Sequence, residues 1–125
     1  MAQILYSPGV CNIGPEEIAR RRRVGWVGLI VAILLFVALY GADVNPWWRL
    51  FIFFPAMFSA SGFLQAYFHF CSGFARRGIF NFGAVGKTEN VTDGASKALD
   101  RRKGSQIASY AALIGAVVAI LCVLI

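Results

Sequence analysis

Apolar residues are concentrated in three long stretches of this 125-residue chain, Val24–Tyr40, Leu50–Phe74 and Ile107–Ile125. An α-helix rises about 1.5 Å per residue, so each stretch is long enough to cross a hydrocarbon core about 30 Å thick. The pattern therefore predicts an all-α, polytopic membrane protein with three transmembrane helices. It divides the chain into a lead-in (1–14), a transmembrane helical hairpin (15–74), a basic loop (75–104) and a third transmembrane helix (105–125).

Local signals mark where the helices begin. Gly14 and Pro15 suit the N-cap and the first position of a helix, and the two glutamates that follow complement its positive end. These signals predict a continuous helix from Pro15 to about Tyr40. Thr92 or Asp93 is suited to cap a further helix that leads into the third stretch.

Basic residues are distributed unevenly around the three stretches. The chain has 12 Lys and Arg against 6 Asp and Glu, and of its basic residues only Arg49 lies between the first and second stretches. Lys and Arg are retained on the cytoplasmic side during insertion, so we expect the N-terminus inside and the C-terminus outside. The net charge of +6 is then a topology signal and does not indicate nucleic-acid binding. We expect lipid or an acidic partner to bind the clustered basic residues, which are Arg20, Arg21, Arg22, Arg23, Arg76, Arg77, Arg101, Arg102 and Lys103.

Small residues recur at helical spacing in all three stretches. Helices in lipid associate through close packing of such residues, so we expect a compact three-helix bundle. A second possibility is that one of these faces docks on another protein. The first stretch contributes Gly25, Gly28 and Ala32. The helix-packing residues expected in the other two are Ser59, Gly62, Ala66, His69, Gly73, Ala108, Ala111, Ala112, Gly115 and Ala119.

Aromatic side chains are concentrated in and beside the second stretch. Phe63, Tyr67, Phe70 and Phe74 have the spacing of a single helix face. Aromatic rings can pack on one another or stack on a planar cofactor. We favour packing, and the sequence does not determine whether a haem, quinone or pigment binds.

Two thiols and one imidazole are the candidate reactive groups. Cys11, Cys71 and His69 are possible redox or metal-binding residues, because thiolate and imidazole suit soft metals and paired thiols can form a disulfide. No CxxC spacing preorganises them, and His69 and Cys71 point about 200° apart on an ideal helix. For His69 we therefore favour a hydrogen bond between helices. Cys122 is expected to behave as a small hydrophobic residue.

The chain offers little for catalysis. All six carboxylates lie outside the apolar stretches, and no phosphate loop, metalloprotease motif or Ser–His–Asp set is present in the sequence. We expect no catalytic residues and no resident metal.

Residues 11–74 open with an asparagine–glycine pair, an acidic residue and arginines, and close near a cysteine. The residues of this pattern are Asn12, Gly14, Glu17, Arg20–Arg23, Gly28, Gly62 and Cys71. The pattern resembles a family of small bacterial inner-membrane domains, best known as the transmembrane hairpin fused to some rhodanese (sulfurtransferase) proteins. The resemblance implies a bacterial cytoplasmic (inner) membrane, a helical hairpin and a link to sulfur chemistry through the cysteine.

Together these features predict a non-catalytic accessory or scaffolding protein of the membrane. It would pack on a larger membrane complex or on another copy of itself. One alternative is a membrane thiol or metal protein that uses Cys11 and Cys71 to handle sulfur or copper. Another is an oligomeric channel or carrier, which requires Ser59, Gln65 and His69 to face a shared cavity.

Overall fold

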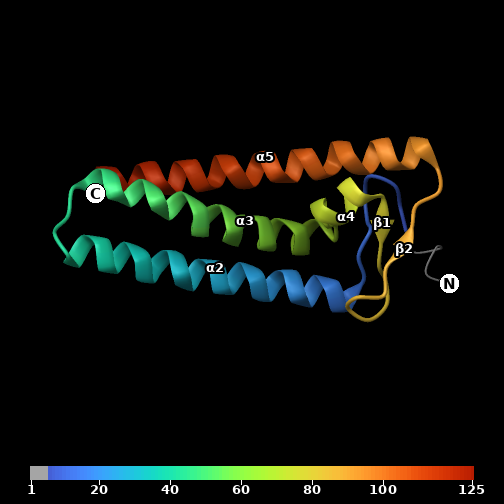
Figure 1. Cartoon of the computed structure of the whole chain (residues 1–125), viewed down its shortest axis with the longest axis horizontal. Coiled ribbons are helices and arrows are strands. Elements are labelled where there is room, and N and C mark those ends of the chain that lie inside the picture. The colour runs from blue at the N-terminus through green and yellow to red at the C-terminus, as the bar shows by residue number, and fades with distance from the viewer. Residues whose placement is uncertain (1–5) are drawn as a thin grey trace.

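The computed structural model describes residues 6–125, so the lead-in before Tyr6 lies outside the described residues. Three helical segments are long and apolar enough to cross a membrane. The first is α2 (Pro15–Gly41), the second joins the 3-10 helix η1 (Pro46–Ile52) to α3 (Phe53–Phe68), and the third is α5 (Gly94–Leu124). The expected all-α architecture with three candidate transmembrane helices is confirmed. Figure 1 shows them side by side along the length of the molecule.

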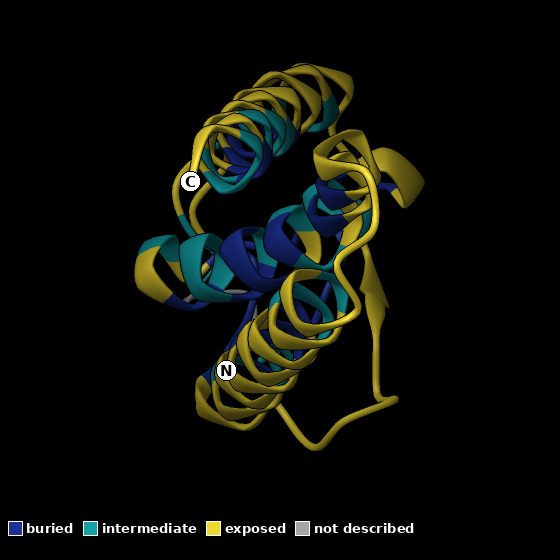
Figure 2. Cartoon of the chain, turned by 90° about the vertical axis from the view of Figure 1, so that its left-hand side faces the viewer, coloured by how far each residue is buried: buried dark blue, intermediate teal, exposed yellow. Residues whose placement is uncertain are grey.

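Helix α3 lies between α2 and α5 and packs against both of them (Figures 1 and 2). In the end-on view of Figure 2, buried residues follow α3 and the inward sides of its two neighbours, while their outer sides are exposed. The three helices therefore form a bent layer, in which the two outer helices both depend on the central one.

Small residues make the contact between α2 and α3. Gly25, Gly28 and Ala32 are the buried apolar positions of α2. A Cβ atom added at Gly28 would lie 2.7 Å from the backbone nitrogen of Ser59, so the two backbones touch. The Ser59 hydroxyl donates a hydrogen bond of 2.7 Å to the carbonyl oxygen of Gly25. Gly62 completes the contact, since its added Cβ would lie 2.6 Å from the Gly25 nitrogen.

The contact between α3 and α5 uses one of the two predicted small-residue faces of the third helix. Ala111, Gly115 and Ala119 are buried against α3, while Ala108 and Ala112 are only half-buried on the flank. A Cβ added at Gly115 would lie 3.0 Å from the Cβ of Met57. Ala66 of α3 is also buried.

The predicted end of the second span was wrong. We expected the helix to continue to Phe74, but α3 ends at Phe68, because His69 adopts a left-handed conformation with φ 54° and caps the helix. A short helix, α4 (Ser72–Arg77), follows and is capped by the Cys71 side chain. The change of direction takes Gly73 away from the α2–α3 contact, and only the Cys71 sulfur lies within 4 Å of its added Cβ.

The predicted helix start before the third stretch is confirmed, because Asp93 caps α5 by accepting a hydrogen bond from the Ser96 amide. The helix then runs from Gly94 into the third stretch without a break, so the boundary expected at residue 105 falls inside it. The expected basic loop is therefore largely ordered structure, and its clustered residues Arg101, Arg102 and Lys103 lie on α5.

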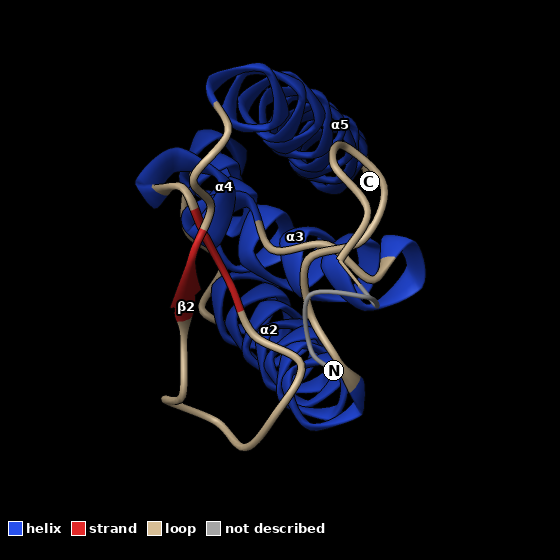
Figure 3. Cartoon of the chain, turned by 90° about the vertical axis from the view of Figure 1, so that its right-hand side faces the viewer, coloured by secondary structure: helices blue, strands red, loops and turns tan. Residues whose placement is uncertain are grey.

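Residues 6–14 and 78–93 fold together into a cap over one end of the helices (Figure 3). Strands β1 (Ile79–Phe80) and β2 (Glu89–Asn90) pair antiparallel, with Ile79 opposite Asn90. The Tyr6 ring stacks on Phe80 at 4.7 Å, and its hydroxyl donates to the buried Asp100 carboxylate of α5. Burial and this hydrogen bond raise the pKa of Tyr6 far above its ordinary value. The cap thus ties the chain before α2 to the start of α5.

At the other end, Arg49 ties the turn between the first two spans to α5. Its Nη1 donates to the carbonyl oxygen of Cys122 at 3.0 Å, and its guanidinium lies 5.1 Å from the centre of the Tyr40 ring. A cation there complements the negative end of the α5 dipole. This role accounts for the one basic residue between the first and second stretches.

Candidate functional site

Five polar side chains meet where the cap joins the helices, and we call them the junction cluster: Asn12, Glu17, Arg21, Cys71 and Asn81. Their centre is the fully buried Glu17 carboxylate, which accepts 2.8 Å and 3.3 Å hydrogen bonds from Arg21 Nη1 and Asn81 Nδ2. A buried carboxylate is tolerated only when it is paired in this way. The pairing places a charged arginine at the edge of the apolar bundle.

Asn12 connects the lead-in to the short segment that joins α3 to α4. Its side chain makes two hydrogen bonds to the backbone of Cys71, donating to the carbonyl at 3.1 Å and accepting from the amide at 2.7 Å. The Asn12 backbone in turn pairs with His69 and Asn81. The side chain therefore satisfies backbone groups that the ended helix leaves free, and it fixes the position of Cys71.

The sulfur of Cys71 faces a cation. Arg21 Nη2 lies 2.9 Å from Sγ, while the same guanidinium is held by Glu17 through Nη1. The Phe74 amide also points at this sulfur, at 3.5 Å. Cys71 is therefore the one cysteine of the three whose sulfur lies within hydrogen-bond distance of a guanidinium.

The other two candidates for redox or metal chemistry make no hydrogen bond to this sulfur within residues 6–125. The Cys11 thiol points to the carbonyl of Ile13 at 3.6 Å, and burial raises the pKa of Cys11. His69 is exposed at the end of α3. Within residues 6–125, no three His, Cys, Asp or Glu side chains are grouped so that they could hold a metal ion. In the described residues, Cys11, Cys71 and His69 therefore form no metal-holding group, and the three cysteines are free.

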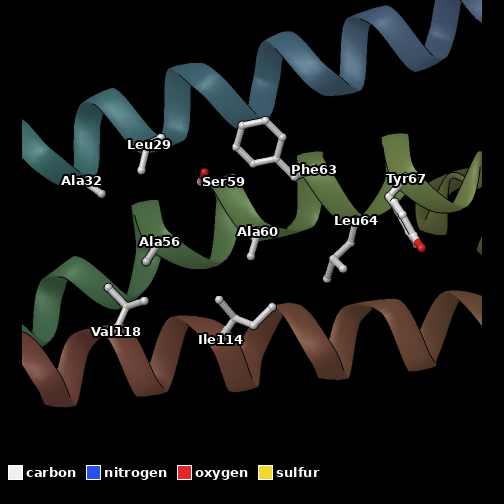
Figure 4. A pocket seen from close by; sticks show the side chains of 10 residues that line it. All are labelled: Leu29, Ala32, Ala56, Ser59, Ala60, Phe63, Leu64, Tyr67, Ile114 and Val118. Carbon is white, nitrogen blue, oxygen red and sulfur yellow. The ribbon is translucent and has the colours of Figure 1, made fainter.

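A second candidate site is an apolar groove in the middle of the helical layer, which we call the mid-bundle groove (Figure 4). It has a volume of about 420 Å³ and receives side chains from all three long helices. Ala56 and Ala60 of α3 line it between Leu29 of α2 and Ile114 of α5. Its lining residues are Leu29, Ala32, Ala56, Ser59, Ala60, Phe63, Leu64, Tyr67, Ile114 and Val118.

The groove exists because α3 separates α2 from α5 and because the middle of α3 carries small side chains. Because α3 keeps α2 and α5 apart, only large side chains would fill the space between them. The alanines of α3 leave that space open. The one buried polar side chain here is Ser59, whose hydroxyl is already bonded to Gly25. The groove therefore offers shape and apolar surface, without groups for chemistry.

The structure does not bring the three polar residues of the channel hypothesis together. Ser59 is bonded within the α2–α3 contact, and Gln65 is bonded to Ser61 and Ser72. His69 is exposed near the cap, and within residues 6–125 its side chain forms no hydrogen bond to another helix. The Ser59 hydroxyl faces α2 instead of a shared polar cavity, which weighs against the channel hypothesis.

The expected aromatic face of the second span is divided by the end of α3. Phe70 and Phe74 are buried at the junction with the cap, whereas Tyr67 is 78% exposed. Phe63 packs edge-on against Trp26 at 5.4 Å. A single flat surface for a planar cofactor is therefore absent from this part of the described chain.

Most of the clustered basic side chains are free at the cap end of the molecule. Residues Arg22, Arg23, Arg76, Arg77, Arg101 and Arg102 are exposed. Arg20 lies 4.0 Å from Glu17 but keeps 53% of its side chain exposed, and Lys103 lies 4.3 Å from the centre of the Phe68 ring.

The side chains that pair with the buried carboxylates of Glu17 and Asp100 were not identified from the sequence. The spacing of Glu17 and Arg21, four residues apart on one helix, is a signal that could have revealed their ion pair. Nothing local marks Asn81, Asp100 or Tyr6, because their partners lie far away along the chain.

Neither the family models, nor the curated proteins, nor the solved structures contain a match to this chain.

Proposed function

We propose that this protein is a non-catalytic accessory subunit that docks a transmembrane helix of a larger membrane complex in its mid-bundle groove. The groove is the observation that carries this proposal. Lipid tails are as apolar as leucine, so a helix gains over lipid by close packing on small residues. Ala32, Ala56 and Ala60 form the buried floor of the groove. Exposed side chains line its walls, among them Leu29, Ile114 and Tyr67.

A partner of a different kind fits the groove better than a second copy. A two-fold dimer uses the same surface on both molecules, and a concave surface does not fill another concave surface. The glycines that would otherwise serve self-association are already occupied, since Gly62 contacts α2 and Gly115 contacts α3. The open surface is therefore complementary to a protruding helix from another protein.

We place the protein in a bacterial cytoplasmic membrane, with the cap inside and the end of α5 outside. Support comes from the clustered basic residues, which lie at the cap end, and from the turn between the first two spans, where Arg49 is engaged with α5. The resemblance to the rhodanese-fused hairpin supports the same location.

The test is an alanine-to-leucine substitution in the groove. Ala60→Leu adds a side chain into the space that the partner would occupy, and Ala38→Leu makes the same change on an exposed position of α2. We expect Ala60→Leu to lose the co-purifying partner in mild detergent while both variants insert and remain helical. Retention of the partner by Ala60→Leu would contradict the proposal.

One alternative is favoured by a specific observation. A membrane thiol protein would use Cys71, whose sulfur lies 2.9 Å from Arg21 Nη2. Four of the residues on which the rhodanese resemblance rests belong to the junction cluster: Asn12, Glu17, Arg21 and Cys71. This alternative requires an added sulfur or a copper ion at Cys71. Intact-mass measurement of the natively purified protein tests for the added mass, and peptide mapping tests whether an added sulfur lies on the Cys71 peptide.

A further inference from the structure

A crevice follows the line where α2 meets α3, on the side of α3 opposite the mid-bundle groove. Its part nearest the cap has a volume of about 420 Å³ and includes Arg20, Arg21 and Arg77. Its deeper part, of about 380 Å³, is lined by apolar residues that include Val27 and Val31. Phe58 lines both parts, so the two are neighbours along the helices.

The mouth of this crevice carries an excess of positive charge. Three arginines line it, and Glu17 is the carboxylate paired with them, which leaves two positive charges uncompensated. Among the described residues, Arg77 has no carboxylate oxygen within 4.0 Å. Arg21 is held in place by Glu17 and Cys71, which engage two of its five N–H donors. A planar fork that is fixed in this way is suited to a phosphate group.

The length of the crevice matches one leaflet of a bilayer. From Arg21 to Val31 helix α2 rises about 15 Å, at about 1.5 Å per residue. That is half of a hydrocarbon core of about 30 Å. The charged mouth lies at the level where α3 ends, since Gln65 and Cys71 line it, and the apolar part includes Val31 in the middle of α2. A molecule with an anionic head and one chain lying in a single leaflet has this shape.

We infer that the crevice binds one anionic phospholipid, with its phosphate at Arg20, Arg21 and Arg77 and an acyl chain along Val27 and Val31. The interaction is specific to this crevice and goes beyond the general attraction of basic residues to an anionic surface. It also does not depend on the mid-bundle groove, which shares no lining residue with it.

The test is lipid binding to the delipidated protein in detergent, followed by native mass spectrometry. Phosphatidylglycerol and phosphatidylcholine with identical acyl chains are the probes. We expect one phosphatidylglycerol to bind more tightly than phosphatidylcholine. Replacing Arg20 and Arg77 together by glutamine should weaken phosphatidylglycerol binding about 25-fold, at about fivefold for each arginine. Both side chains are exposed, so the Glu17–Arg21 pair and the fold are kept.

Matched variants distinguish binding of the lipid phosphate from binding of the lipid acyl chain. Arg101→Gln with Arg102→Gln removes two exposed charges outside the crevice and should leave binding unchanged. Val27→Trp fills the apolar part and should weaken the binding of the lipid, whereas Val37→Trp, an exposed position elsewhere on α2, should not. Equal affinity for the two lipids, or no effect of the Arg20 and Arg77 changes, would overturn the inference. Inorganic phosphate that displaces the lipid, together with no effect of Val27→Trp, would assign the site to a free oxyanion and also overturn it.

Discussion

Gly62 is the position where a single methyl group should separate two of the three helices. In Gly62→Ala the new Cβ would lie 2.6 Å from the Gly25 nitrogen and 2.7 Å from the Arg21 carbonyl oxygen. Both are backbone atoms, so no side-chain rotation relieves the contact. To reach ordinary van der Waals contact at 3.4 Å, α2 and α3 must move apart by about 0.8 Å.

This movement sets the expected cost. A gap of about 0.5–1 Å forfeits roughly a quarter to a half of the dispersion attraction across a contact, and overpacking of this kind costs about 1–3 kcal/mol. The 2.7 Å bond from Ser59 to Gly25 would stretch toward the limit of a hydrogen bond, which removes about 0.6 kcal/mol more. We therefore expect Gly62→Ala to destabilise the α2–α3 contact by about 2 kcal/mol.

The assay is unfolding in mixed micelles with increasing dodecyl sulfate, followed by the fluorescence of Trp26. This residue packs against Phe63 of α3 and reports separation of the helices once Trp47 and Trp48 are replaced by phenylalanine. Gly41→Ala is the matched control, because nothing lies within 4 Å of its added Cβ. If Gly62→Ala unfolds at the same detergent fraction as Gly41→Ala, the close backbone contact is refuted.

Three further predictions concern the cap and the topology. Glu17→Gln should lower the stability of the junction by about 2 kcal/mol, because Arg21 loses its charged partner, while Glu16→Gln at an exposed position should not; the same unfolding assay measures both. The raised pKa of Tyr6 means that its contribution is fully present below its unfolded pKa of about 10 and is lost at higher pH. An alkaline opening of the cap, monitored by proteolysis, should therefore shift in Tyr6→Phe, and an unchanged profile would contradict this assignment. Finally, a reporter fused after Ile125 should be active only outside the cytoplasm, and activity inside would reverse the proposed orientation.

The sequence predicts the helices well because their signals are local. The length and apolar composition of a stretch, and the Gly14-Pro15 helix start, can each be read from contiguous sequence. Helix α2 begins and ends close to the predicted positions. Packing through Gly25, Gly28 and Gly62 also follows from spacing, since only the smallest residues allow backbones to touch.

The cap and the end of α3 could not be predicted, because both depend on residues that are distant in the chain. Asn12 satisfies the Cys71 backbone across 59 positions, and Tyr6 reaches Asp100 across 94. His69 lies within an apolar run whose composition favours a longer helix, yet these distant contacts are available only if the helix ends there. The alanines of α3 that line the mid-bundle groove were not among the expected packing residues, and they line a groove only because α3 lies between the other two helices.

The most direct test of the docking proposal is purification of the tagged protein from its native membrane, in parallel with Ala60→Leu and Ala38→Leu. Mass spectrometry and an absorption spectrum on the same samples identify any partner and any coloured cofactor that it carries. We predict a stoichiometric membrane protein with the wild type and with Ala38→Leu, and its loss with Ala60→Leu. A wild-type protein that purifies alone, or only with copies of itself, would contradict the account.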